Sequence, residues 1–179
     1  MNVKTELEQR YATEEEIGVY YACMSTEKRQ ELMTPEERAK ADIIAYLPSG
    51  EPMGTCTNCA RVVASDYPGR ADIYGFLCEQ NPECTDDEIQ CVGGHDFCVV
   101  DRRYVVDLWI SLYTGLESQV VFDLQDPADR DKITQYFGNP QNWAVIVDNC
   151  FVYPTESNYP EEKRLELEEL PVFNSMAPV

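Results

Sequence analysis

The sequence predicts an α+β fold in which N-terminal helices and one further helix pack on an antiparallel sheet. Helix signals are concentrated in the first 66 residues, and short β-branched and aromatic runs separated by turns follow from residue 71. Strands joined by such short connections pair antiparallel. With 179 residues, 44% of them hydrophobic, the chain is long and apolar enough for one domain with a substantial core.

Two or three helices are expected in the N-terminal part, residues 1–47. Thr13 is an N-cap candidate with acidic residues in the following turn, and Ser25–Met33 is a second short helix. Thr34, followed by proline and two glutamates, forms a capping box for a helix ending near Tyr46. A loop containing proline and glycine follows over 48–55.

The remaining chain is expected to carry the sheet. We expect helices over 56–66 and from Asp126 to Phe137, a cysteine-bearing loop over 78–92, and strands over 71–77, 95–100, 103–109, 120–124 and 143–153. Residues 1–153 are therefore interpreted as one domain, in which 50–110 carries the candidate cysteine, histidine and aspartate residues. The acidic, proline-containing residues 154–179 are interpreted as a C-terminal tail that packs over the body or is mobile.

The composition excludes several classes of partner. The formal net charge is -19, which argues against binding to nucleic acid or to an anionic membrane and favours a basic partner or simply solubility. No apolar run approaches the length of a membrane span, and the N-terminus lacks the apolar core of a signal peptide. We expect a cytoplasmic protein, or one exported without a cleavable signal, whose 8 cysteines are mainly thiols rather than disulfides.

Cys56 is the first candidate for a reactive group. It stands at the start of the expected helix 56–66, after a loop shaped by Gly50, Pro52 and Gly54. A thiol attacks as the thiolate, which a helix N-terminus or a cationic imidazole stabilises. Cys59 lies one turn further along on much the same face and is the alternative nucleophile. Both cysteines could equally be small buried hydrophobic residues.

His95, the only histidine, and Asp107 complete a possible constellation. The two strands of a hairpin would bring them together if residues 99 and 103 pair around an odd-numbered loop. An even-numbered loop would place the two side chains on opposite faces. A carboxylate inside the apolar run 104–109 requires a donor, and an imidazole N–H is a suitable one. Cysteine, histidine and aspartate in this order match a thiol nucleophile, its base and an orienting carboxylate.

A zinc site is the main alternative chemistry. Cys56 and Cys59 form a Cys-x-x-Cys pair that later cysteines or His95 could complete. However, His95 and Cys98 lie three apart on an expected strand and therefore point to opposite faces. We expect no metal and no other cofactor. A disulfide-stapled secreted fold is a further alternative.

Four segments resemble the papain-like and transglutaminase-like superfamily, which includes protein-glutamine deaminases and papain-fold toxin domains of bacteria. They are Gly54–Ala60, similar to the start of a nucleophile helix; Ala71–Phe76, similar to the strand after it; His95–Val100, similar to the histidine strand; and Arg103–Trp109, similar to the aspartate strand. The resemblance covers residues 50–110 and implies a Cys56, His95, Asp107 triad. The Cys-Gly-Ser-Cys-Trp signature of papain is absent, and no glutamine stands just upstream to donate to an oxyanion.

These observations predict a cysteine-dependent enzyme that acts on an amide in a protein or peptide by deamidation, proteolysis or transamidation. The acidic composition favours a basic substrate. Two alternatives remain open at this point: a zinc-stabilised, cysteine-rich binding module, and an inactive acidic adaptor.

Overall fold

The computed structural model describes residues 2–11, 55–113 and 119–167, with the side chains of Thr55 and of residues 111–113 excepted. The helices expected over 13–21, 25–33 and 34–46 lie outside these residues, as does the loop before Thr55. Helix α1, Val3–Tyr11, precedes all of them and was not expected. It buries Leu7 and Tyr11.

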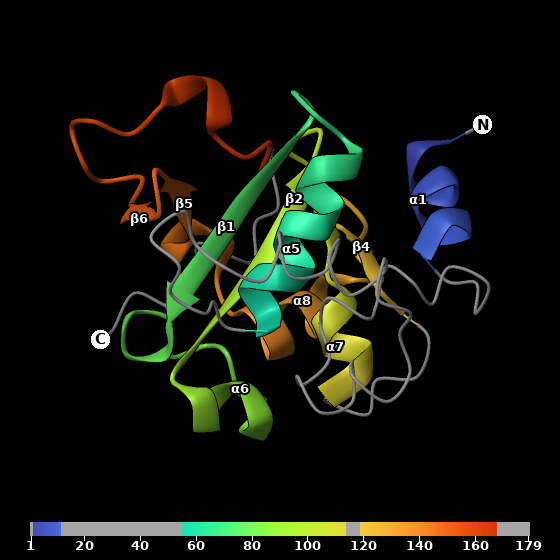
Figure 1. Ribbon diagram of the computed structural model, residues 1–179. Coiled ribbons are helices and arrows are strands. Elements are labelled where there is room, and N and C mark those ends of the chain that lie inside the picture. The colour runs from blue at the N-terminus through green and yellow to red at the C-terminus, as the bar shows by residue number, and fades with distance from the viewer. Residues whose placement is uncertain (1, 12–54, 114–118, 168–179) are drawn as a thin grey trace, which may run out of the picture.

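A six-stranded antiparallel sheet forms the centre of the molecule (Figure 1). The strand order is β4-β3-β2-β1-β5-β6, so the two long strands β1 and β2 lie in the middle. The strands are β1 Ala71–Leu77, β2 Gly94–Val100, β3 Tyr104–Val106, β4 Val121–Asp123, β5 Ala144–Val147 and β6 Cys150–Val152.

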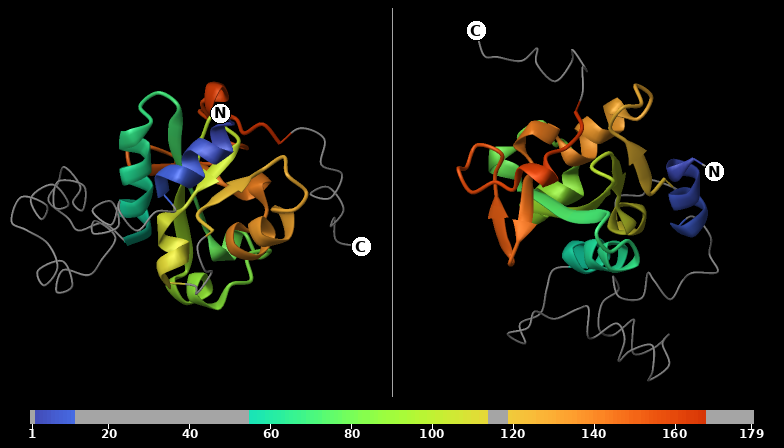
Figure 2. Two further views of the ribbon diagram at one scale, coloured as in Figure 1. Left: turned by 90° about the vertical axis from the view of Figure 1, so that its right-hand side faces the viewer. Right: turned by 90° about the horizontal axis from the view of Figure 1, so that it is seen from above.

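Helices cover both faces of this sheet (Figure 2). The longest, α5, spans Thr55–Asp66 and packs on one face, and α8, Arg130–Phe137, lies on the other. Helix α7, Leu108–Tyr113, contacts α5 beside the end of β3, and α6, Asp87–Val92, precedes β2. Three 3-10 turns complete the described elements: Cys78–Gln80, Pro140–Asn142 and Glu161–Lys163. The coarse prediction of an α+β fold with an antiparallel sheet is confirmed.

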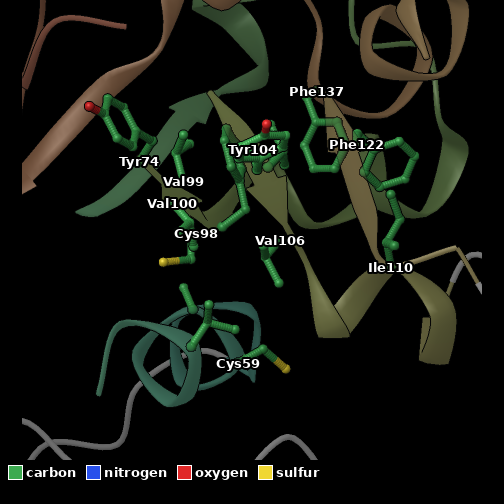
Figure 3. Close-up of a cluster of buried hydrophobic side chains, with 14 of the residues drawn as sticks. Cys59, Tyr74, Cys98, Val99, Val100, Tyr104, Val106, Ile110, Phe122 and Phe137 are labelled. Atoms are coloured by element: carbon green, nitrogen blue, oxygen red, sulfur yellow. The ribbon is translucent and has the colours of Figure 1, made fainter. Parts of the chain in front are cut away.

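The core occupies both sides of the sheet. Figure 3 shows Cys98 and Val106 directed toward α5, which carries Cys59, with Phe122 and Phe137 packed on the opposite face. All five side chains are buried. Burying aliphatic and aromatic side chains stabilises the fold by about 1.5–3 kcal/mol each. Because both faces are covered, the two central strands carry apolar residues on both sides, and Asp72, His95 and Asp96 are the charged or titratable exceptions.

Several predicted elements differ in extent. The run 143–153 is not one strand but the hairpin β5–β6, which turns at Asp148 and Asn149 with positive φ angles of 51° and 63°. The loop expected over 78–92 contains α6, because Asp86 accepts hydrogen bonds from two backbone N–H groups of that helix. Helix α8 begins at Arg130 rather than Asp126, since a turn occupies the residues between them.

The described part of the C-terminal segment packs on the body. Tyr159 is buried, and the Tyr74 hydroxyl of β1 donates to the carbonyl of Lys163. The Lys163 ammonium in turn lies 2.5 Å from a carboxylate oxygen of Asp72. Residues 159–163 therefore contact the sheet.

Candidate active site

His95 lies in the first half of β2, inside an aromatic enclosure. Its side chain is 0% exposed. The ring centroids of Trp109, Phe97, Phe137 and Phe76 lie 4.9, 5.9, 6.0 and 6.5 Å from the imidazole. Such an enclosure holds the ring in one orientation and excludes water from it.

His95 and Asp107 are in contact, although not in the register that the hairpin argument assumed. The His95 Nε2 atom lies 2.5 Å from Asp107 Oδ2, and the carboxylate is 1% exposed. The register differs by two residues from the one expected: Cys98 pairs with Val106 and Val100 with Tyr104, so Asp107 lies diagonally from His95. The loop has the required odd length, at residues 101–103, and both side chains keep the same face.

The turn of this hairpin is well anchored. Asp101 and Arg102 have φ angles of 53° and 56°, and the Arg103 N–H donates to the Val100 carbonyl at 3.2 Å. Two successive positive φ angles are characteristic of a type I′ turn. Arg70 donates through two nitrogens to the Asp101 carboxylate. The turn at residues 101–103, with its ion pair to Arg70, therefore helps to fix the register of β2 and β3 that brings Asp107 to His95.

Asp107 is not inside a strand. Strand β3 ends at Val106, and Asp107 Oδ1 accepts from the backbone N–H groups of Trp109 and Ile110 at 2.9 and 3.3 Å. It is the N-cap of α7, so the strand expected over 103–109 is wrong after residue 106. One carboxylate oxygen holds the helix and the other holds the imidazole.

This pairing favours the charged imidazole. Burial alone lowers the pKa of His95, but the charge of Asp107 and its hydrogen bond outweigh burial, and an interaction with Cys56 adds to them. Together they raise the pKa from 6.5 to about 10. The Nδ1 atom has no hydrogen bond of standard geometry. Cys56 is therefore close enough to influence the pKa of the imidazole without making a full hydrogen bond to it. Such loose contacts are common in active sites before substrate binds.

The two candidate thiols differ chemically. Cys56, the second residue of α5, is a free thiol and partly exposed. Cys59 is buried and bonded in a disulfide. A disulfide sulfur carries no thiol proton to give to a base. The structure therefore leaves Cys56 as the available thiol of the pair, and the expectation that the cysteines are thiols does not hold for Cys59.

The other described cysteines lie apart from this constellation. Cys78, Cys84 and Cys98 are buried free thiols, and Cys91 and Cys150 are exposed ones. Burial raises the pKa of the Cys84 thiol to about 11, which disfavours its thiolate. Cys98 points toward α5 while His95 packs against aromatic rings on the other face, as their spacing predicts. No group of three potential metal-ligating side chains occurs within the described residues.

Comparison with known proteins gives no relative: no family model, no curated protein and no solved structure matches this chain. Among the helices that the structure describes, none has the length and apolar character needed to cross a membrane.

Proposed function

We propose that this chain is a cysteine-dependent enzyme that acts on an amide carbonyl, with Cys56 as nucleophile, His95 as acid and base, and Asp107 as the orienting carboxylate. One observation carries the proposal, namely the surroundings of the fully buried His95 imidazole. Its Nε2 atom contacts the buried carboxylate of Asp107, and its Nδ1 atom has no hydrogen bond of standard geometry and lies beside the free thiol of Cys56. Most buried side-chain nitrogens in proteins are hydrogen-bonded, so an Nδ1 atom without such a bond beside a free thiol supports a role in proton transfer. The resemblance of residues 50–110 to papain-like and transglutaminase-like enzymes supports the same assignment.

The reaction has two halves. The Cys56 thiolate attacks the carbonyl carbon, and the His95 imidazolium gives its proton to the leaving amine or ammonia as the C–N bond breaks. A thioester remains on Cys56. His95, now neutral, takes a proton from water, whose oxygen attacks the thioester, and the carboxylic acid leaves as the Cys56 sulfur is released. An amine in place of water gives transamidation. Asp107 holds the ring in the tautomer and orientation that both halves require.

The developing oxyanion needs donors. Cys56 stands in the first turn of α5, where backbone N–H groups have no acceptor within the helix. These groups, with the positive end of the helix dipole, are the donors that we assign to the oxyanion. This assignment replaces the upstream glutamine that the sequence lacks.

The proposed substrate is a side-chain or main-chain amide of a protein or peptide. The net charge of -19 favours a basic one, since an acidic surface attracts cationic partners. We place the protein in the cytoplasm, or outside the cell after export without a cleavable signal. The disulfide at Cys59 favours the second location, because disulfides persist in oxidising compartments.

The test is ammonia release and peptide cleavage, measured on a mixture of basic glutamine-containing peptides with and without added amine. Cys56→Ser and His95→Ala should each abolish turnover, by at least about 10³-fold, while circular dichroism remains unchanged. Cys91→Ser, at an exposed thiol outside the site, is the matched control and should retain full activity. Full activity in Cys56→Ser would refute the proposal.

A second test needs no substrate. At about pH 6 an ordinary thiol is almost wholly protonated and reacts slowly with iodoacetamide. Cys56 beside a cationic imidazole should react at least about tenfold faster than Cys91 and Cys150 in the same molecule, and His95→Ala should remove the difference. Equal rates at all three thiols would contradict the proposed nucleophile.

A further inference from the structure

A second carboxylate lies beside the proposed site, on the opposite face of β2 from His95. Asp96 follows His95 directly, and its Oδ2 atom accepts a hydrogen bond of 2.6 Å from the hydroxyl of Thr57. Thr57 directly follows Cys56 in the first turn of α5. One hydrogen bond thus joins the sequence neighbours of the proposed nucleophile and base.

The fold makes room for this carboxylate. Gly75 of β1 pairs with Asp96, and a Cβ atom added at Gly75 would lie 2.3 Å from Asp96 Oδ1 and 2.9 Å from the ring of Phe151. A side chain at position 75 would therefore push the carboxylate away from Thr57. The φ angle of Gly75 lies outside the left-handed region, so glycine is needed here for space and not for backbone conformation.

Keeping an acid at this place is unfavourable for folding alone. Burial raises the pKa of Asp96, although the Thr57 hydrogen bond and the charge of His95 both act to lower it. Among the described residues, Thr57 is the only side chain that hydrogen-bonds the carboxylate. A partly buried carboxylate with so few partners costs free energy that an amide side chain would avoid. Such groups are concentrated at functional sites.

The first turn of α5 needs a restraint of this kind. Helix ends fray because their terminal backbone groups lack partners, and Cys56 is only the second residue of α5. Further along the helix, Cys59, Ala60 and Val63 are buried against the sheet. The Thr57–Asp96 hydrogen bond extends this attachment to the end of the helix that carries the thiol.

We infer that Asp96 is a positioning residue that, through Thr57, holds the first turn of α5 so that the Cys56 thiol stays at the His95 imidazole. The inference rests on the proposed function of Cys56 and His95. A displacement of about 1 Å in a reacting group lowers a rate by as much as about 10²-fold. Loss of the link should therefore lower the reactivity of Cys56 while the fold is kept.

The experiment compares removal of the link with its conservative replacement. Thr57→Val removes the hydroxyl at nearly constant shape, and Asp96→Ala removes the acceptor, whereas Thr57→Ser and Asp96→Asn keep a donor and an acceptor. Iodoacetamide labelling at about pH 6, read by mass spectrometry, gives the rate at Cys56 relative to exposed Cys91 in each variant. We expect Thr57→Val and Asp96→Ala to lower this ratio at least about tenfold, and the two conservative variants to stay within about threefold of wild type.

Two further measurements make the result decisive. The double variant Thr57→Val/Asp96→Ala should show no greater loss than either single variant, because both remove the same link. Circular dichroism checks that each variant is folded. Gly75→Ala, which crowds the Asp96 carboxylate while Thr57 and Asp96 stay unsubstituted, serves if Asp96→Ala unfolds. Because the added Cβ would also lie 3.0 Å from the His95 carbonyl oxygen, a loss in Gly75→Ala supports the link only when Thr57→Val shows it too.

The outcomes separate the two proposals. A wild-type ratio in folded Thr57→Val and Gly75→Ala would overturn the positioning role alone. A wild-type protein whose Cys56 reacts no faster than Cys91 would overturn the proposed function. An equal fall of the Cys56 to Cys91 rate ratio in Thr57→Ser and Thr57→Val would also overturn the positioning role. The reactivity of Cys56 would then not depend on the hydroxyl that donates to Asp96.

Discussion

His95 is the residue on which the candidate site depends most. Its ring is completely buried, yet only Nε2 is hydrogen-bonded, to Asp107. Nδ1 lies beside the Cys56 thiol without a hydrogen bond of standard geometry. This nitrogen is therefore available for proton transfer to and from Cys56.

The raised pKa of His95 predicts how stability changes with pH. The pKa is about 10 in the folded protein and near 6.5 in the unfolded chain. The folded state therefore binds a proton that the unfolded chain releases in this interval, and the stabilisation is complete below about pH 6.5 and lost as the pH rises through about 10. We expect the stability advantage of wild type over His95→Gln to shrink by a few kcal/mol between about pH 6 and pH 10.

Urea unfolding of both proteins at each pH measures this difference, and subtracting the variant removes the contributions of other titrating groups. A stability difference that does not change over this range would mean that His95 is neutral in the folded protein. The imidazolium assigned to it would then be wrong.

At the scale of the elements, the sequence predicts the segments that have independent local signals. The helix 56–66 and the strand 71–77 are found with almost the same bounds. The pattern around Asp107 was ambiguous, because Val105-Val106-Asp107-Leu108-Trp109 fits an apolar strand as well as a strand end and a helix cap. Only the contact of Asp107 with the α7 N–H groups decides between them.

Other features could not be found from local patterns. The β5–β6 hairpin was hidden because Asp148 and Asn149, which are suited to a type I′ turn, interrupt an otherwise apolar run by only two residues. The role of Asp96 depends on Thr57, 39 residues away, and on the missing side chain at Gly75. Contacts of this kind depend on tertiary packing. The hydrophobic periods that identify strands (two residues) and helices (3.6 residues) carry no information about which distant residues meet.

The double role of Asp107 gives a prediction at this scale. Asp107→Asn keeps an oxygen that can cap α7 but loses the charge that favours the imidazolium, whereas Asp107→Ala loses both. Both variants should lower Cys56 alkylation at about pH 6 toward the rate of Cys91. The alanine variant should in addition be less stable than the asparagine variant by roughly 0.5–2 kcal/mol, the usual value of an N-cap. Urea unfolding checks the second part, and wild-type alkylation in Asp107→Asn would show that the residue is only a cap.

At the scale of the whole molecule, the chain is strongly acidic, and its core lies between a central sheet and the helices that cover both faces of that sheet. The net charge of -19 opposes compactness through self-repulsion, and the described ion pairs offset only part of it. In the candidate site, a disulfide at Cys59 lies one helical turn from the free thiol of Cys56. The disulfide distinguishes the two cysteines by chemistry rather than by position.

The state of Cys59 can be tested directly in the intact protein. Denatured in iodoacetamide without reductant, the chain should be alkylated at Cys56 but not at Cys59, and prior reduction should make both react, as peptide mapping would show. Reduction should also lower the free energy of unfolding by about 2–4 kcal/mol, because the unfolded chain regains conformational freedom that the crosslink removed. Cys59→Ser should lose the same stability and be insensitive to reductant, which separates the disulfide from other effects of the reagent. Alkylation of Cys59 without reductant would show that it is a thiol, and the choice of Cys56 over Cys59 would then rest on position alone.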